Sequence, residues 1–490
     1  MKLSTLFLPP SCYHILTAAL ATASNALQHT HFFTDNLIHK IKAIPRSTRN
    51  IMLALLCLVS FLTVGAISGV GSPKHDSNDI DEPYSPINST YMALSIIARQ
   101  QGIMINNTQP GSALQSGIVQ KAFTAHIAYH GPNSKMQEYI DNSTASAAKY
   151  MASTIDDVKD WPLDRLSNAN AMLSGKGLAY ELALDALRDS IRLNRRNDEG
   201  GLWYWESYPD WSYLDGMYSL GPFAALDSRL GGSSTAEVMG SNTTTTAAAT
   251  AQVTATATKA DRRAGAALED MHLQFRLLWD HCYNSTTGLL VHGYDASRKA
   301  SWASRTSGAS AVAWGRSLGW FMMALVDTME LMPAPAGPSP GNPGASLLGM
   351  YQRLATSVVG YADRASGGWY QVVDMARREG NYVESSATAM FSYALLKGAR
   401  LGYLPPFDAS VARKAGRAAY ALLAREFVTS EPDGTLGWAG TVAICSLNST
   451  ATYDYYVSQP IAPNSVLGAA AFILASLEVE RLDDGPNTPQ

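Results

Sequence analysis

Residues 314–331 read WGRSLGWFMMALVDTMEL, and this stretch decides the expected fold. Its apolar side chains recur at the three- and four-residue spacing of an amphipathic helix, so one stripe is predicted to face a core. The stripe consists of Leu318, Phe321, Met322, Leu325, Val326 and Met329. Similar patterns cover 92–101, 177–193, 388–401 and 411–427, without alternating strands and helices. The sequence therefore predicts an all-α protein.

The helical region is expected to form one domain over 79–482. Two segments depart from the helical pattern. Residues 231–259 form a Ser/Thr/Ala-rich tract, which we interpret as an insert on a surface loop. Residues 333–343 are rich in Pro and Gly, which predicts a turn region between two helices. Helical patterns lie on both sides of each segment, so neither is expected to separate two cores.

An uncharged hydrophobic segment precedes the helical region. Residues 51–70 are long enough to cross a bilayer core of about 30 Å. Basic residues precede the segment, which places 1–50 in the cytosol and the later residues in the lumen. Either 51–71 is a cleaved signal peptide, with the true start at Met52, or the segment remains as a membrane anchor. The helical domain is thus expected to be secreted, or anchored with its catalytic part lumenal or extracellular.

Acceptor sites for N-glycosylation agree with export. Six Asn-x-Ser/Thr sequences occur, at Asn88, Asn106, Asn142, Asn242, Asn284 and Asn448. Of the four cysteines, Cys282 and Cys445 lie beyond the hydrophobic segment, where they form either one disulfide or two buried thiols. No Cys/His spacing indicates a metal site, and no cofactor is expected. The formal net charge of −4, without a long basic run after residue 50, argues against a nucleic-acid partner.

A cluster of aromatic residues surrounds one acid. Residues 200–223 read GGLWYWESYPDWSYLDGMYSLGPF, with Asp215 among seven tryptophans and tyrosines. These are Trp203, Tyr204, Trp205, Tyr208, Trp211, Tyr213 and Tyr218. Such rings suit stacking against sugars, and burial among them would raise the pKa of Asp215 toward that of a proton donor. The alternative is that Asp215 caps the helix that follows it.

Three further stretches combine polar and aromatic residues. In LLVHGYDASRKASW, residues 289–302, His292 is either part of a site or a structural histidine. In WGRSLGW, Arg316 lies one helical turn before Trp320, so it could bind a carboxylate beside the ring, or pair with a protein carboxylate. Residues 367–390 contain Asp374 and Glu384, for which solvated or structural roles are expected in place of a role in a site.

These motifs resemble glycoside hydrolase family 105, the unsaturated rhamnogalacturonyl hydrolases. The resemblance rests on WSYLDGMYSLGPF, HGYDAS, WGRSLGWFMMALVD and GGWYQVVD followed by REGNYVESSATAMFSYALLKGARLGYL, in the same order. It covers roughly residues 168–477. It implies an (α/α)6 toroid, with six inner and six outer helices and a pocket at one mouth of the ring.

The resemblance also implies an unusual reaction. Polysaccharide lyases leave a C4=C5 double bond in the uronic acid at the non-reducing end, and members of this family hydrate it, which releases the neighbouring sugar. One acid can protonate C4 and then accept a proton from the attacking water, whereas ordinary glycosidases use two carboxylates. Motif matching implies Asp215 as the donor. The substrate-binding residues would be His292, Arg316, Trp314, Trp320, Trp203 and Tyr204.

Two departures from the family pattern bear on the site. Tyr204 stands where many relatives carry a histidine after GGxW. A second, upstream aspartate of the relatives is replaced here by Asn168 or Asn170, with Asn170 the assisting position we favour, unless Asp164 supplies the carboxyl. The alternatives for function are an unsaturated glucuronyl hydrolase, a conventional hydrolase with a second carboxylate facing Asp215, and a cell-wall sugar-binding protein without turnover. We expect an oligosaccharide partner and a monomer.

Overall fold

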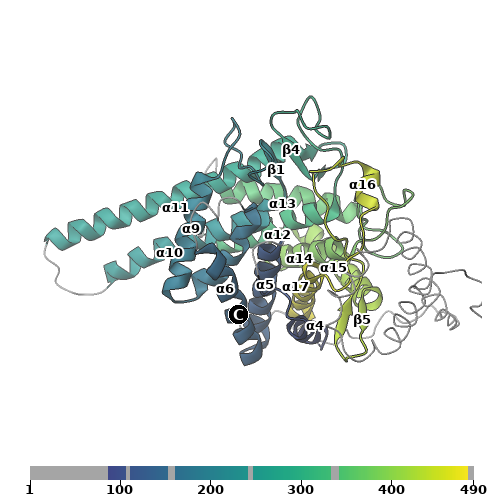
Figure 1. The fold of residues 1–490 in the computed structure, drawn as a ribbon, viewed down its shortest axis with the longest axis horizontal. Coiled ribbons are helices and arrows are strands. Elements are labelled where there is room, and N and C mark those ends of the chain that lie inside the picture. Colours follow the sequence, from purple (N-terminus) through teal and green to yellow (C-terminus); the bar gives the residue numbers. More distant parts are fainter. Residues whose placement is uncertain (1–86, 106–110, 153–160, 241–246, 333–341, 484–490) are drawn as a thin grey trace, which may run out of the picture. The chain divides into compact units, whose positions relative to one another are not determined.

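The computed structural model describes residues 87–105, 111–152, 161–240, 247–332, 342–483, and it is mostly helical (Figure 1). The helices are α4 (Ile87–Ala98), α5 (Ser112–His130), α6 (Ser134–Met151), the 3-10 helix η1 (Leu163–Asn168), α8 (Ala169–Ser174), α9 (Leu178–Leu193), α10 (Gly216–Gly240), α11 (Ala247–Cys282), α12 (Gly315–Leu331), α13 (Pro343–Gly360), α14 (Ser385–Arg400), α15 (Pro406–Glu426), α16 (Tyr453–Val457) and α17 (Val466–Asp483). The strands are β1 (Trp211–Tyr213), β2 (Tyr283–Asn284), β3 (Leu289–Leu290), β4 (Gly293–Asp295), β5 (Val428–Ser430) and β6 (Leu436–Trp438).

The inner helices contact one another in a closed cycle. Following the contacts from α5 leads to η1, then to α10, α12, α14 and α17, and back to α5. Figure 1 shows α5, α12, α14 and α17 together in the middle of the helical body. Almost every residue of α12, α14 and α17 is buried, as expected for helices enclosed on all sides.

A second set of helices covers this cycle. The outer helices α6, α9, α11, α13, α15 and α4 contact α5, α8, α10, α12, α14 and α17 respectively. They are buried along one stripe only; in α13 the stripe includes Leu347, Met350, Tyr351 and Leu354. The arrangement agrees with the all-α toroid that the sequence predicts, in which each inner helix packs beside an outer one.

Small residues let the inner helices approach closely. A Cβ atom on Gly319 of α12 would lie 2.9 Å from the Cβ of Met390 on α14. A Cβ atom on Gly221 of α10 would lie 2.3 Å from the Thr328 hydroxyl on α12. Larger residues at these two positions would push the helices apart, so the glycines determine how tightly the cycle closes.

Short strands position the loops at the N-terminal ends of the inner helices. Strand β1 pairs with β4 in antiparallel register, with Trp211 opposite Asp295 and Tyr213 opposite Gly293. The backbone N–H of Leu214 continues this pairing by donating to the carbonyl of His292 at 3.1 Å. The pairing brings the segment that contains Asp215 next to the segment that contains His292.

The interpretation of 231–259 as a loop is wrong for the part that the structure describes. Helix α10 continues through Gly240, and α11 begins at Ala247. The two helices contact each other and run side by side at the left of Figure 1. Alanine has the highest helix propensity, and the tract is rich in it, which outweighs the weaker preference of Ser and Thr. Of the predicted turn region, residues 333–341 lie outside the described residues.

The predicted signal or anchor segment cannot be compared with the structure. The segments 1–50 and 51–71 lie outside the described residues. Among the helices that the structure describes, none has the length and apolar character needed to span a bilayer.

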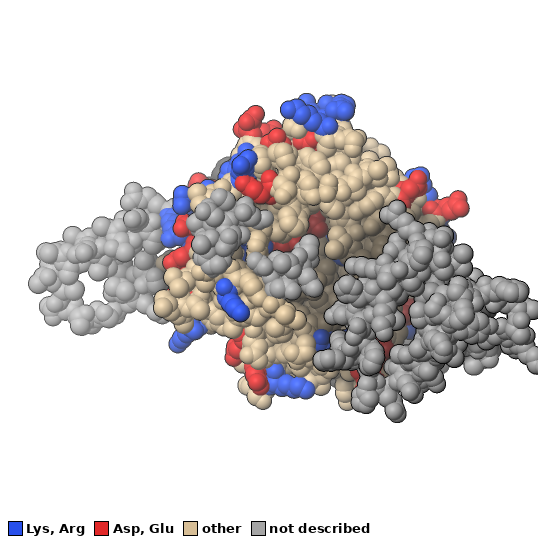
Figure 2. Space-filling model, viewed as in Figure 1, with Lys and Arg blue, Asp and Glu red and all other residues tan. Residues whose placement is uncertain are grey.

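Cys282 and Cys445 are two free, buried thiols and do not form a disulfide. On the face that Figure 2 shows, basic and acidic residues occur in small groups on a mostly uncharged surface.

Candidate active site

Asp215 lies between β1 and the first residue of α10, and its side chain is almost buried. The residue is 8% exposed. The Ser317 hydroxyl, in the first turn of α12, donates to Asp215 Oδ2 at 2.5 Å. His292 Nε2 lies 3.4 Å from the same oxygen, within ion-pair range. Asp215 and His292, which the sequence predicted to share a site, are therefore brought together.

His292 is held from its other side by a tyrosine. The ring is 1% exposed, and its Nδ1 lies 2.7 Å from the hydroxyl of Tyr456 on α16. Burial raises the pKa of Tyr456 well above its usual value, so the phenol keeps its proton. A neutral imidazole that accepts this proton at Nδ1 carries its own hydrogen on Nε2, which faces Asp215.

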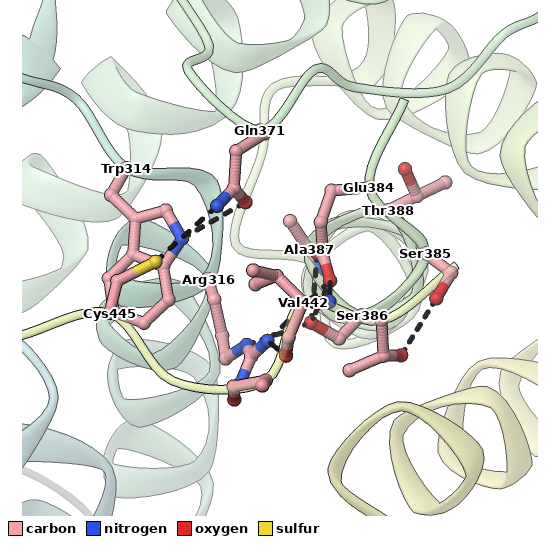
Figure 3. A network of polar contacts seen from close by, with 12 residues as sticks. Trp314, Arg316, Gln371, Glu384, Ser385, Ser386, Ala387, Thr388, Val442 and Cys445 are labelled. Atoms are coloured by element: carbon pink, nitrogen blue, oxygen red, sulfur yellow. Dashed lines mark hydrogen bonds and ion pairs between the residues drawn. The ribbon is translucent and has the colours of Figure 1, made fainter. Parts of the chain in front are cut away.

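Aromatic rings surround the histidine. The ring centroid of Trp314 lies 4.8 Å from that of His292, and the centroid of Tyr213 lies 5.3 Å away. Tyr204 stacks on Tyr213 with centroids 4.5 Å apart and planes inclined by 10°. The indole N–H of Trp314 donates to Gln371 Oε1 at 3.1 Å, which fixes the ring (Figure 3). The predicted residues Trp314 and Tyr204 thus belong to one wall with His292.

Arg316 has protein partners on each of its three nitrogens. Nε donates to the Ser386 hydroxyl at 3.0 Å and Nη1 to the Ala443 carbonyl at 2.9 Å, while Nη2 donates to the Val442 carbonyl. Nη2 also lies 3.7 Å from Glu384 Oε1 (Figure 3). The guanidinium stands over the ring of Trp314, 5.3 Å from its centroid. This is the protein ion pair that the sequence left open as the alternative to binding a substrate carboxylate.

Glu384 completes this network from the N-terminal end of α14. Its carboxylate accepts from the backbone N–H of Ala387 at 2.6 Å, which caps α14, and from the backbone N–H of Val442 at 3.0 Å. Both Glu384 and Arg316 are buried. Together they fasten the loop around Val442 to the first turns of α12 and α14. The structural role expected for Glu384 is confirmed.

Trp320 and Trp203 are placed differently from Trp314. Trp320 is 1% exposed and packs against Tyr218 of α10, with centroids 4.4 Å apart, so it belongs to the core one turn beyond Arg316. Trp203 is buried beneath the Arg195 guanidinium, 5.4 Å from the ring centroid, and its indole N–H has no protein partner. That N–H is itself buried, as is most of the ring.

Asp164, the carboxyl considered as the alternative to Asn170 in the assisting position, lies near enough to Asp215 for their charges to interact. Asp164 lies on η1, where the backbone N–H of Leu163 donates to the Tyr204 carbonyl at 3.2 Å and holds the turn against Tyr204. Burial raises the pKa of Asp164 to about 7; a hydrogen bond from the Tyr204 hydroxyl opposes the shift, and the negative charge of Asp215 adds to it. Asn170, by contrast, lines a cavity that does not include Asp215.

Asn168, the other position considered, has a structural role. Its Oδ1 accepts from the Ser116 hydroxyl at 2.7 Å and from the Gln120 amide at 2.9 Å. Its own amide donates to the Ala113 carbonyl at 2.8 Å. Asn168 therefore ties η1 to α5 and lies within the packed interior.

The sequence did not single out two residues of the site. Ser317 follows Arg316 directly within the WGRSLGW motif, so its position beside the predicted site residues was the available signal. Tyr456 lies 164 residues from His292 along the chain, and nothing in its local pattern distinguishes it from other tyrosines. Asp374 is partly buried, and burial raises its pKa, but no contact links it to Asp215.

Comparison with known proteins identifies the family. The family model of Glycosyl Hydrolase Family 88 matches residues 249–483. A protein of Agrobacterium fabrum, Atu3128, is 36% identical over 197 residues, which are 39% of this chain and 82% of that protein. A glycoside hydrolase of family 105 from C. acetobutylicum is 27% identical, with a TM-score of 0.65 over 80% of this chain and 99% of that structure.

More distant structures share the fold. The unsaturated glucuronyl hydrolase of Bacillus sp. GL1, described as responsible for glycosaminoglycan degradation, has a TM-score of 0.56 at 15% identity, over 81% of this chain and 97% of that one. The chain belongs to the related glycoside hydrolase families 88 and 105. It is accordingly a glycoside hydrolase, and its family implies an oligosaccharide substrate.

Proposed function

We propose that the protein hydrates the C4=C5 double bond of an unsaturated galacturonyl unit and so releases it from the non-reducing end of lyase-generated rhamnogalacturonan oligosaccharides. The observation that carries the proposal is the environment of Asp215, a nearly buried carboxyl that contacts Ser317 and His292. The family resemblance of the motifs around these residues supports the same reaction.

The reaction needs one proton donor and one water molecule. Protonated Asp215 gives its proton to C4, the electrons of the double bond form the new C–H bond, and positive charge develops at C5 and its ring oxygen. Water then adds to C5, and its proton passes to the Asp215 carboxylate, which restores the acid. The product is a hemiketal that opens and releases the neighbouring sugar. The two steps leave the enzyme unchanged and consume one water molecule.

Asp164 supports this role for Asp215. A buried carboxyl whose pKa is about 7 holds a proton through the acidic range, so Asp164 adds no second negative charge when the Asp215 carboxylate forms after proton transfer. The Nε2 hydrogen of His292 and the Ser317 hydroxyl stabilise the carboxylate that forms after proton transfer. Trp314, Tyr204 and Tyr213 provide flat faces for the sugar rings.

A direct assay tests the reaction and the sugar together. Rhamnogalacturonan digested by a lyase absorbs in the ultraviolet through its unsaturated uronate, and the protein is expected to remove this absorbance. A parallel digest with unsaturated glucuronyl ends tests the glucuronyl alternative. Asp215→Asn should abolish turnover and keep oligosaccharide affinity, because the shape is preserved and only the proton is lost. An unchanged absorbance with folded protein in both digests would contradict the proposal.

One observation favours a second candidate, a conventional glycosidase that cleaves saturated linkages. Such an enzyme needs two carboxyl groups at the scissile bond, and Asp164 lies close enough to Asp215 for their charges to interact. Oligosaccharides reduced at the double bond distinguish the two reactions, since only a conventional glycosidase would release sugar from them. A sugar-binding protein without turnover would bind both kinds of oligosaccharide and release nothing.

We also propose that the protein is exported and N-glycosylated. The hydrophobic segment 51–70 would direct export, as a cleaved signal or an anchor. Three of the acceptor asparagines, Asn142, Asn284 and Asn448, are exposed, as glycan attachment requires. Treatment of the protein from its native host with an N-glycosidase should lower its mass. An unchanged mass would contradict the glycosylation proposal.

A further inference from the structure

One exposed acceptor asparagine, Asn448, lies in the loop between β6 and α16. The backbone carbonyls of the same loop, at Val442 and Ala443, hold Arg316. The Asn448 side chain is exposed, and its Nδ2 donates to the Tyr208 hydroxyl at 2.5 Å. An N-glycan is attached through this nitrogen. A glycan on Asn448 would therefore begin at Tyr208.

Tyr208 and Trp211 form the outer edge of the aromatic wall around Asp215. Their rings stack with centroids 5.1 Å apart and planes inclined by 17°. Trp211 begins β1 and precedes Asp215 by four residues, a span of at most about 14 Å even in a fully extended chain. Both rings are partly exposed, whereas Asp215 and Tyr213 are buried. Tyr208 and Trp211 are therefore rings that a sugar unit outside the buried site can reach.

The backbone next to Asn448 is held against the segment that contains His292. Leu447 is buried, and a Cβ atom added to Gly293 would lie 3.0 Å from Leu447 Cδ1. Gly293 directly follows His292, whose Nε2 lies 3.4 Å from Asp215 Oδ2. The loop is thus packed against the same short strands that position the site. The acceptor asparagine therefore stands at the edge of the site and not on a remote surface.

A long substrate has to pass this edge of the site. The released unit is the last one at the non-reducing end, so it occupies the buried site while the rest of the oligosaccharide extends toward solvent. Sugar rings stack on aromatic side chains, which makes the partly exposed Tyr208 and Trp211 suitable for the next units. An N-glycan is bulky and hydrophilic. On Asn448 it would compete with these units for the same surface.

We propose that an N-glycan on Asn448 limits the length of the oligosaccharides that the Asp215 site accepts. A disaccharide ends close to the buried site and binds beneath the glycan, whereas a long oligosaccharide has to displace the glycan from Tyr208 and Trp211. The Asn448 amide keeps one hydrogen after attachment, so its contact with Tyr208 can be retained. The inference rests on the proposed export of the protein and on the proposed reaction at Asp215.

Variants of the acceptor sequence test the proposal in the full chain secreted by a eukaryotic host. Thr450→Ala removes the acceptor sequence and leaves Asn448 and Tyr208 unchanged. Thr450→Ser keeps the acceptor sequence and is the matched control. Thr286→Ala removes the acceptor sequence of Asn284 on β2, in a hairpin that contacts the outer helix α13. Both threonines are exposed, so neither change disturbs the core.

Calorimetry measures oligosaccharide affinity in the Asp215→Asn background, where substrate is bound and not consumed. Thr450→Ala should bind the long fragments of a lyase digest about 3- to 10-fold more tightly, because they no longer have to displace the glycan. Its affinity for the disaccharide should stay the same. Thr450→Ser and Thr286→Ala should match the background in both affinities. Enzymatic removal of the glycans from the folded background protein should reproduce the gain.

Mass spectrometry of the Asn448 peptide measures glycan occupancy independently of activity. A secreted chain without a glycan on Asn448 overturns the proposal, as does an unchanged affinity for long fragments in Thr450→Ala. An equal gain in Thr286→Ala also overturns it, because the effect would then not depend on where the glycan is attached. A chain that binds the oligosaccharides and hydrolyses none contradicts the proposed reaction, while the affinities still decide the length limit. A chain that binds none of them overturns both.

Discussion

The hydroxyl of Tyr456 lies 2.7 Å from Nδ1 of His292, whose Nε2 lies 3.4 Å from Asp215. The three side chains thus form a relay that starts on α16 and ends at the proposed acid. Tyr456 sets which imidazole nitrogen carries hydrogen, and so determines whether His292 can donate to the Asp215 carboxylate. Tyr456 makes no hydrogen bond to Asp215 itself, which makes it a positioning residue.

Tyr456→Phe should lower kcat about 5-fold, because the imidazole loses the bond that fixes its tautomer, which is worth about 1 kcal/mol. KM should change little, since the ring shape is kept. Tyr455→Phe is the matched control on the same helix, because its hydroxyl contacts the Ser446 backbone and not His292. Steady-state kinetics on the unsaturated oligosaccharide measures both. Equal losses of kcat in the two variants would show that α16 acts only as scaffold.

Asp164→Asn should change how stability depends on pH. The pKa of Asp164 is about 7 in the folded protein and about 4 in an unfolded chain, so the folded state holds an extra proton between these values. Raising the pH from 4 to above 7 ionises the buried carboxyl, and the unmodified protein loses stability over this window. Asparagine does not ionise, so the variant should not lose stability over this pH window.

Denaturant unfolding at pH 4.5 and pH 8 measures the effect as the difference between the two proteins. The variant should gain stability relative to the unmodified chain at the higher pH, by an amount on the order of a few kcal/mol. Asp374→Asn is a useful comparison, since burial raises the pKa of that carboxyl too, without contact to the relay. If the stability of the Asp164 variant and that of the unmodified protein depend on pH in the same way, Asp164 does not hold the extra proton of the folded state.

The sequence predicted the helices well because their apolar spacing is local information. The helix expected at 318–331 is observed as α12 (Gly315–Leu331), and that expected at 411–427 as α15 (Pro406–Glu426). Both helices begin earlier than predicted. A proline at the first helical position, or a first turn without apolar spacing, leaves little periodic signal from which to place the start. The tract at 231–259 was misjudged because composition was given more weight than the helix propensity of alanine.

The site could be predicted only where its residues lie within contiguous motifs. Asp215 and His292 are joined by the β1–β4 pairing, and both stood out by their local surroundings. The contact of Tyr456 depends on chain topology, which residue spacing does not reveal. The partners of Arg316 are mostly backbone carbonyls of a distant loop, so the sequence could not decide between a substrate contact and an ion pair.

Arg316→Met should destabilise the protein by about 3–5 kcal/mol, because it leaves the Glu384 carboxylate buried without its counter-charge. The double variant with Glu384→Gln should recover part of the loss, since the unpaired charge is then removed as well. Denaturant unfolding measures both. If Arg316 instead serves the substrate carboxylate, the single variant would raise KM strongly and leave the unfolding midpoint in place.

Asp327 is the centre of a charged group between α5, α12 and α14, and Asp327→Asn should lower the free energy of unfolding by about 3–5 kcal/mol. Its carboxylate contacts Lys121, lies 2.6 Å from Lys397, and accepts from the Tyr393 hydroxyl at 2.7 Å. Removing its charge leaves Glu330 as the remaining acidic partner of Lys397, so Lys121 and Lys397 repel each other more strongly. The exposed pair of Asp189 with Arg192 is the control, and Asp189→Asn should cost less than about 1 kcal/mol. Similar losses in the two variants would mean that water already screens the lysines, and that Asp327 contributes no more than a surface charge.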